Sequence, residues 1–139
     1  MTRKEALVKF LGCEVNEIFG PSGFMADADT VFECGRQEYM VLLDSEADDK
    51  VTEYIKESVW AFNPEFLAAH AIEGIDAEVI KAIQDNDRCE GNNKALTALI
   101  KDFEHFVNDA VSSDGRGHFL NTYDGRENEM GEYFIYRLN

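Results

Sequence analysis

The sequence has few basic residues, three cysteines and no long apolar run. No stretch approaches the roughly 18 continuous apolar residues of a membrane span, and residues 1–4 open no apolar run, so we expect neither a transmembrane helix nor a signal peptide. Cys13, Cys34 and Cys89 form no CxxC pair, and an odd number of cysteines is a poor disulfide framework. A reducing, cytoplasmic environment fits best.

The rest of the composition is typical of one folded domain. The chain has 139 residues, of which 45% are hydrophobic and 12% aromatic. A disordered acidic chain lacks aromatic and β-branched residues, so this composition indicates a real core. We therefore predict a single globular domain over residues 1–139.

Negative charge dominates the sequence. There are 28 acidic against 13 basic residues, a net charge of −15, and residues 44–90 alone carry 13 acids and 4 bases. Such a surface repels nucleic acid and anionic membranes and attracts basic proteins. The alternative is that the charge only keeps the protein soluble or reflects an acidic or halophilic proteome.

The first half predicts a helix, a hairpin and a long helix. Residues 2–5 have capping-box spacing before a helix that ends near Gly12. Two strands, 30–34 and 38–43, form a hairpin, and the second is apolar enough to be central. A helix follows from Asp44 to about Phe62. Between the first helix and the hairpin, we expect three side chains to point inward: Ile18, Phe19 and Phe24.

The second half predicts more helices and two further strands. Asn63 and Pro64 begin a short helix, and Asp76 caps the next, which ends near Gln84. Apolar spacing indicates one amphipathic helix over 94–111. After a turn over 112–117, residues 118–123 and 132–138 have the composition of strands. Segregated helices and strands predict an α+β fold with a four-stranded, mainly antiparallel sheet and helices packed on one face.

Four acidic residues spaced three or four apart lie on one face of the predicted helix over 44–62. They span 11 residue steps from Glu46 to Glu57, or about 16 Å at 1.5 Å per residue. DNA carries a phosphate roughly every 3.4 Å along each strand, so this row is able to imitate part of a phosphate backbone. An ordinary solvated helix face is the alternative. The candidate partner-binding residues are Glu46, Asp49, Glu53, Glu57, Asp48, Glu65, Glu73, Asp76 and Glu78.

The spacing of the histidines matches no known metal-binding motif. The chain has three, His70, His105 and His118, with no HExxH or HxH motif, and neighbouring carboxylates such as Asp109 do not complete a recognisable pattern. We assign no metal site, no cofactor and no catalytic residue. A calcium loop over 85–96 also fails, because its fifth position is Cys89, its sixth is Glu90 where glycine is needed, and its twelfth is Leu96.

The sequence does not indicate nucleophilic catalysis either. It has no GxSxG motif, and acidic neighbours should raise the pKa of the Cys89 thiol, which makes it a weaker nucleophile. The turn over 114–118 is the most distinctive in the chain. It is either a chain reversal that needs positive φ or a contact loop presenting Arg116 and His118. The aromatic cluster at Trp60 is either a core anchor or a partner contact.

Three segments resemble small acidic proteins encoded by bacteriophages and prophages: residues 57–63 (ESVWAFN), 115–125 (GRGHFLNTYDG) and 133–137 (YFIYR). The resemblance carries no catalytic residues. It implies a bacterial host cytosol and an inhibitor of host machinery, as anti-CRISPR and antirestriction proteins that imitate DNA are.

We therefore expect a phage-type inhibitor whose acidic face blocks a basic, nucleic-acid-binding host protein. It would not be an enzyme and would bind neither nucleic acid nor membrane directly. One alternative is a self-assembling structural or regulatory protein, for instance a homodimer, that uses exposed aromatics such as Trp60 or Tyr133. Another is a metal-dependent enzyme that uses carboxylates and His118.

Overall fold

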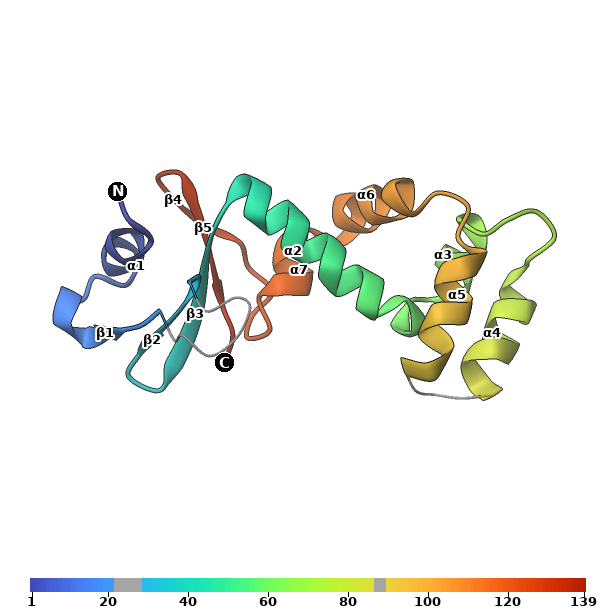
Figure 1. Cartoon of the computed structure of the whole chain (residues 1–139), viewed down its shortest axis with the longest axis horizontal. Helices are drawn as coiled ribbons and strands as arrows, with labels where there is room; N and C mark the ends of the chain where they lie inside the picture. Colours follow the sequence, from blue (N-terminus) through green and yellow to red (C-terminus); the bar gives the residue numbers. More distant parts are fainter. Residues whose placement is uncertain (22–28, 87–89) are drawn as a thin grey trace. The chain divides into compact units, whose positions relative to one another are not determined.

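The computed structural model describes residues 1–21, 29–86 and 90–139, which form seven α-helices and a five-stranded antiparallel sheet (Figure 1). These residues fall into two compact units, unit 1 (Met1–Val51 and Asp114–Asn139) and unit 2 (Thr52–Ser113). The predicted α+β class is confirmed, although the sheet has five strands where four were predicted. The prediction of one domain stays a prediction.

Unit 1 is built around the sheet, in the order β1-β2-β3-β5-β4. The central strand is β3, as the apolar run predicted, and β2 and β5 both pair with it. The strands are β1 (Ile18–Phe19), β2 (Val31–Cys34), β3 (Gln37–Leu43), β4 (Asn128–Met130) and β5 (Tyr133–Arg137).

Helices cover both faces of the sheet, so the prediction of one covered face is wrong. Helix α1 (Arg3–Leu11) buries Ala6 and Leu7 against Val41 and Ile135. Because side chains alternate along a strand, Phe134 and its even-numbered neighbours face the other way. On that opposite face lies α7 (Arg116–Leu120), whose first residue stacks on the Phe134 ring (Figure 1).

Local sequence signals explain the ends of α1 and the hairpin. The Thr2 side chain accepts a hydrogen bond from the Glu5 backbone, Glu5 returns one, and Gly12 closes the helix at φ 67°. The link between β2 and β3 is also as predicted, with Gly35 at φ 65°. Strand β1 follows a single 3₁₀ turn, η1 (Val15–Glu17).

The inward-pointing residues before the hairpin are only partly as predicted. Ile18 is buried, but Phe19 is 66% exposed. Successive residues of a strand point to opposite sides, so both side chains of β1 cannot enter the same core. Phe24 lies outside the described residues.

Unit 2 is helical. It contains the last part of α2 (Asp44–Glu57), then η2 (Val59–Ala61), α3 (Pro64–Ala69), α4 (Ala77–Asn86), η3 (Glu90–Asn92), α5 (Asn93–Leu99) and nearly all of α6 (Phe103–Asp114). Its core includes Ile55, Leu67, Ile80, Leu96 and Phe106. Helix α2 stops five residues earlier than predicted, and the chain continues as a 3₁₀ turn.

The predicted helix over 94–111 is two helices. Ile100 is extended, with ψ 125°, and forms a β-bridge with Ala71. Two long-range backbone bonds hold this break, Ile72 N to Leu99 O at 2.8 Å and Lys101 N to His70 O at 2.8 Å. Asp102 then accepts a hydrogen bond from the His105 backbone and starts α6. The periodic spacing of apolar residues continues across this break, so the sequence pattern did not predict it.

The predicted strand over 118–123 is also wrong, because residues 116–120 are helix α7. Gly115, at φ 84°, separates α6 from α7, and Asn121 N bonds to Gly117 O at its end. The turn predicted over 112–117 is correspondingly shorter, because α6 extends to Asp114. The following strand β4 was not predicted.

Candidate functional site

The predicted acidic row lies on α2, but its first member is turned inward. Glu46 accepts two hydrogen bonds from the Arg3 guanidinium, at 2.7 and 2.8 Å, and a third from Leu43 N. These bonds, the Arg3 pair first, lower the pKa of the Glu46 carboxyl. Glu46 therefore joins α1 to the start of α2, and only Asp49, Glu53 and Glu57 of the row are exposed.

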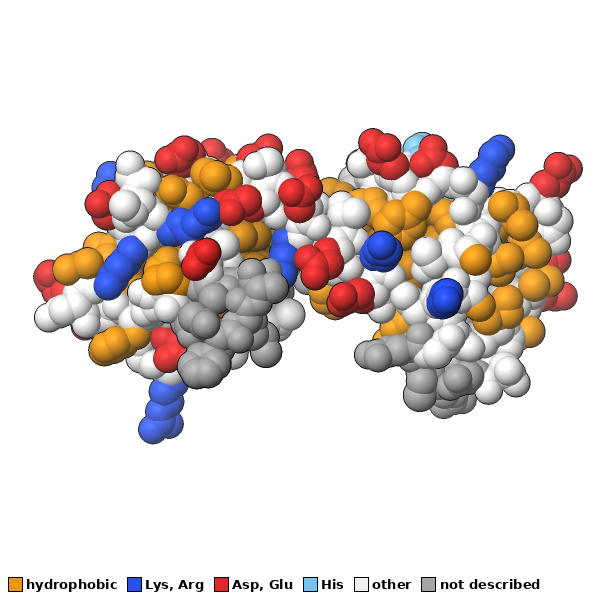
Figure 2. All heavy atoms as spheres, viewed as in Figure 1, with side chains coloured by type: hydrophobic (Ala, Val, Ile, Leu, Met, Phe, Trp, Pro, Cys, Tyr) orange, Lys and Arg blue, Asp and Glu red, His pale blue; other side chains and the backbone are white. Residues whose placement is uncertain are grey.

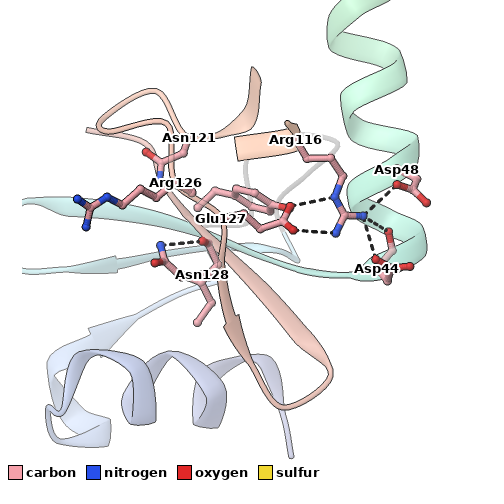
Figure 3. A network of polar contacts seen from close by, with 9 residues as sticks. Asp44, Asp48, Arg116, Asn121, Arg126, Glu127 and Asn128 are labelled. Atoms are coloured by element: carbon pink, nitrogen blue, oxygen red, sulfur yellow. Dashed lines mark hydrogen bonds and ion pairs between the residues drawn. The ribbon is translucent and has the colours of Figure 1, made fainter. Parts of the chain in front are cut away.

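Arg116 is not the exposed contact residue that was predicted. Its side chain is only 11% exposed, and its Nη1 lies 3.0 Å from Asp44 Oδ1 and 2.9 Å from Asp48 Oδ1 (Figure 3). Nε and Nη2 donate to the two carboxylate oxygens of Glu127, at 2.9 and 3.1 Å. Asp48, predicted as a partner contact, is thus held by an internal ion pair.

The same network reaches into the sheet. The Tyr136 hydroxyl donates to Glu127, and burial followed by that hydrogen bond raises the pKa of Tyr136. Burial opposes the charge of Arg116, but Glu127 and Asp48 more than offset it, so the pKa of Arg116 is raised. A permanently charged arginine held by three carboxylates is an anchor for α2, α7 and the segment before β4.

The loop after α7 is organised by one buried amide. Asn121, 2% exposed, accepts from the backbones of Tyr123 and Asp124 and donates to Arg126 O (Figure 3). His118 is exposed on α7 with its ring edge against Phe119. His118 is therefore exposed, and its role as a contact residue stays a prediction, whereas Arg116 serves the fold.

Five acidic candidates of unit 2, among them Glu57 of the row on α2, fall in one stretch of the sequence. Residues 57–80 contain five acids and no lysine or arginine. All five carboxylate residues are exposed, and the same stretch exposes two aliphatic side chains, Ile72 (44%) and Val79 (39%). We call this the acidic surface; its members are Glu57, Glu65, Glu73, Asp76 and Glu78.

Helix starts place several of these carboxylates. Asn63 caps α3 by accepting from Glu65 N at 2.8 Å, and Asp76 caps α4 by accepting from Val79 N at 3.0 Å. Glu65 and Glu78 then fall in the first turns, where the helix dipole favours negative charge. Helices α3 and α4 pack on each other. Figure 2 shows hydrophobic side chains over this region, with acidic side chains at its outer edge.

A second cluster in unit 2 was not predicted. His70 Nε2 lies 2.9 Å from Asp109 Oδ2, and His105 Nε2 lies 4.0 Å from the same oxygen. His70 is buried, whereas the side chains of His105 and Asp109 are 65% and 49% exposed. His105 and Asp109 are one turn apart on α6, a spacing that was available in the sequence; His70 comes from the end of α3 and has no such signal.

The two thiols that the structure describes show no sign of an activated nucleophile. Cys13 and Cys34 are free and partly buried in unit 1, and burial, followed by the neighbouring Cys34, raises the pKa of Cys13. A raised pKa reduces the thiolate fraction, which is the reactive form. Cys89 lies outside the described residues.

The two aromatics named for self-assembly are not presented equally. Tyr133, at 9% exposure, is buried in the core beneath α1, so it is excluded as a surface contact. Trp60 is half-buried, and the backbone around it is tied to Asn93 and Gln84.

No family model, no curated protein and no solved structure matches the chain. Within the described parts of the chain, no helix has both the length and the apolar character needed to cross a membrane.

Proposed function

We propose that this protein is a binding protein, not an enzyme, whose acidic surface occupies a basic surface of another protein. The observation that carries the proposal is the run from Glu57 to Ile80, where five exposed carboxylates occur without one lysine or arginine. Unit 2 as a whole has 12 acids against 5 bases, so its own cations do not balance it.

The chemistry of this surface matches a nucleic-acid-binding partner. Complementary charge between two proteins steers their association and adds specificity. An acidic surface therefore needs a basic partner surface, and proteins that bind nucleic acid carry such surfaces to contact phosphates. Ile72 and Val79 add apolar area to the same stretch, which supplies affinity that charge alone does not give. Glu46 and Asp48 contribute less, because each is already paired with an arginine of this chain.

The partner class is proposed more narrowly from the sequence. Residues 57–63, 115–125 and 133–137 resemble small acidic phage proteins. On that ground we propose that the partner is a host defence or DNA-processing protein in the bacterial cytosol, and that binding inhibits it.

Reversing two charges of the acidic surface tests the proposal. In pull-downs from a bacterial lysate at low salt, Glu73→Lys/Glu78→Lys is expected to recover about 10- to 100-fold less of a nucleic-acid-binding partner, since like charges across an interface cost several kcal/mol. Recovery by the unmodified protein should fall at high salt because exposed charges are screened.

A matched variant shows whether the effect depends on where the charges are reversed or only on the change in net charge. Glu33→Lys/Glu132→Lys changes the net charge equally but lies in unit 1, and both residues are exposed. It should retain the partner. Equal recovery by both double variants, or recovery unaffected by salt, would remove the acidic surface from the mechanism. Recovery of this chain alone would favour self-assembly.

A further inference from the structure

A buried histidine at the end of α3 is held in one orientation. The His70 ring lies among three others, 5.1 Å from Phe66, 5.4 Å from Phe106 and 5.2 Å from His105, measured between ring centroids. Its backbone carbonyl accepts from Lys101 N at 2.8 Å. The aromatic neighbours leave Nε2 directed at Asp109, 2.9 Å from Oδ2. The imidazole is therefore fixed before any ligand binds.

The other two groups lie one helical turn apart on α6. His105 Nε2 is 4.0 Å from Asp109 Oδ2, and one ligating atom from each of the three residues lies within 4.8 Å of the others. Zinc bonds to imidazole nitrogen and carboxylate oxygen are about 2.0–2.2 Å long, so ligand atoms in a tetrahedral site are roughly 3.3 Å apart. The distances of 2.9 and 4.0 Å fall on either side of that value.

We propose that His70, His105 and Asp109 bind one zinc ion. Movements of about 1 Å by the exposed His105 and Asp109 side chains bring the three atoms to tetrahedral spacing, with the ion between them. The half-exposed side of the cluster leaves the fourth position to water. Two imidazoles with one carboxylate favour zinc over magnesium or calcium, which prefer oxygen ligands.

Zinc at this position would tie the end of α3 to α6. The segments that follow α3 and precede α6 already meet through the bridge between Ala71 and Ile100 and through the Lys101 bond to His70. An ion that binds the folded state and not the unfolded state raises the stability of the folded state. The proposed site uses none of the carboxylates of the acidic surface, so each proposal stands or fails without the other.

Zinc titration of the tag-free, chelator-stripped protein against a chromophoric zinc indicator tests the site. We expect about one zinc ion per chain, a thermal unfolding midpoint several degrees higher with zinc, and no competition from magnesium. His105→Ala and Asp109→Asn are expected to bind at least about tenfold more weakly. Both positions are substantially exposed, so these variants are expected to fold.

The matched control is His118→Ala, which removes an exposed histidine of unit 1. It should bind zinc as the unmodified protein does. The proposal is overturned if the unmodified protein takes up no zinc, or if His105→Ala and Asp109→Asn bind zinc as tightly as the control. Loss of the zinc-dependent rise in the unfolding midpoint in these two variants alone would support it.

Discussion

Gly117→Ala is expected to lower the free energy of unfolding by about 3 kcal/mol, near the upper end for overpacking a core. An added Cβ would lie 2.5 Å from Gly125 O, 2.8 Å from Arg126 C and 2.8 Å from Glu127 N. All three are backbone atoms, which do not turn aside as a flexible side chain does. In a helix, alanine normally stabilises the fold by about 1 kcal/mol relative to glycine. A loss of stability in this variant would therefore point to the steric clash and not to helix propensity.

Urea denaturation followed by circular dichroism measures this effect. His118→Ala is the matched control, because it introduces alanine at an exposed position of the same helix and should change stability by less than about 0.5 kcal/mol. A Gly117→Ala protein as stable as the unmodified one would mean that α7 does not rest against the 125–127 backbone.

Arg116→Met is expected to cost about 2–3 kcal/mol of unfolding free energy, somewhat less than a fully buried ion pair because Asp44 and Asp48 are largely exposed. Removing the guanidinium leaves Glu127 beside the Tyr136 hydroxyl without its cation and leaves Asp44 and Asp48 to repel each other. Arg116→Lys should recover only part of the loss, because an ammonium cannot make the two-pronged contact with Glu127.

Arg126→Met is the matched control. Arg126 is exposed in the same loop, and its guanidinium points away from the network (Figure 3). Its loss should change the free energy of unfolding, measured by urea denaturation, by less than about 0.5 kcal/mol. If Arg116→Met and Arg126→Met unfold at the same urea concentration, the network does not anchor unit 1.

Elements with local signals were predictable from the sequence. Thr2 and Glu5 marked the start of α1, Gly12 its end, and Asn63 with Pro64 the start of α3, because caps act within one turn of the chain. The apolar run in β3 indicated a central strand, because a continuous apolar run is itself a local signal of a strand buried on both faces. Each of these signals is complete within a few residues.

Elements set by distant contacts were not predictable. The break at Ile100 depends on bonds to Ile72 and His70, and α7 is placed by the close approach of Gly117 to the 125–127 backbone. Strand β4 is short and polar, so no alternation of apolar residues marks it. In each case the deciding partner lies elsewhere in the sequence.

The candidate sites follow the same division. Sequence reasoning centred the acidic face on the row from Glu46 to Glu57 and named the other carboxylates of residues 57–80 only as additions to it; the structure exposes all of the latter. Sequence reasoning did not show that Glu46 and Asp48 are paired with Arg3 and Arg116. The cluster of His70, His105 and Asp109 joins two helices, and only its half on α6 had a spacing that sequence reasoning could use.

Displacement of nucleic acid from the recovered partner tests the central claim most directly. The partner would be loaded with fluorescently labelled DNA or RNA, and the released fraction would be measured by anisotropy as this protein is added. Competition for one basic surface predicts full release by the unmodified protein and little release by Glu73→Lys/Glu78→Lys. A stable ternary complex, in which the partner holds both the labelled strand and this protein, would contradict the account.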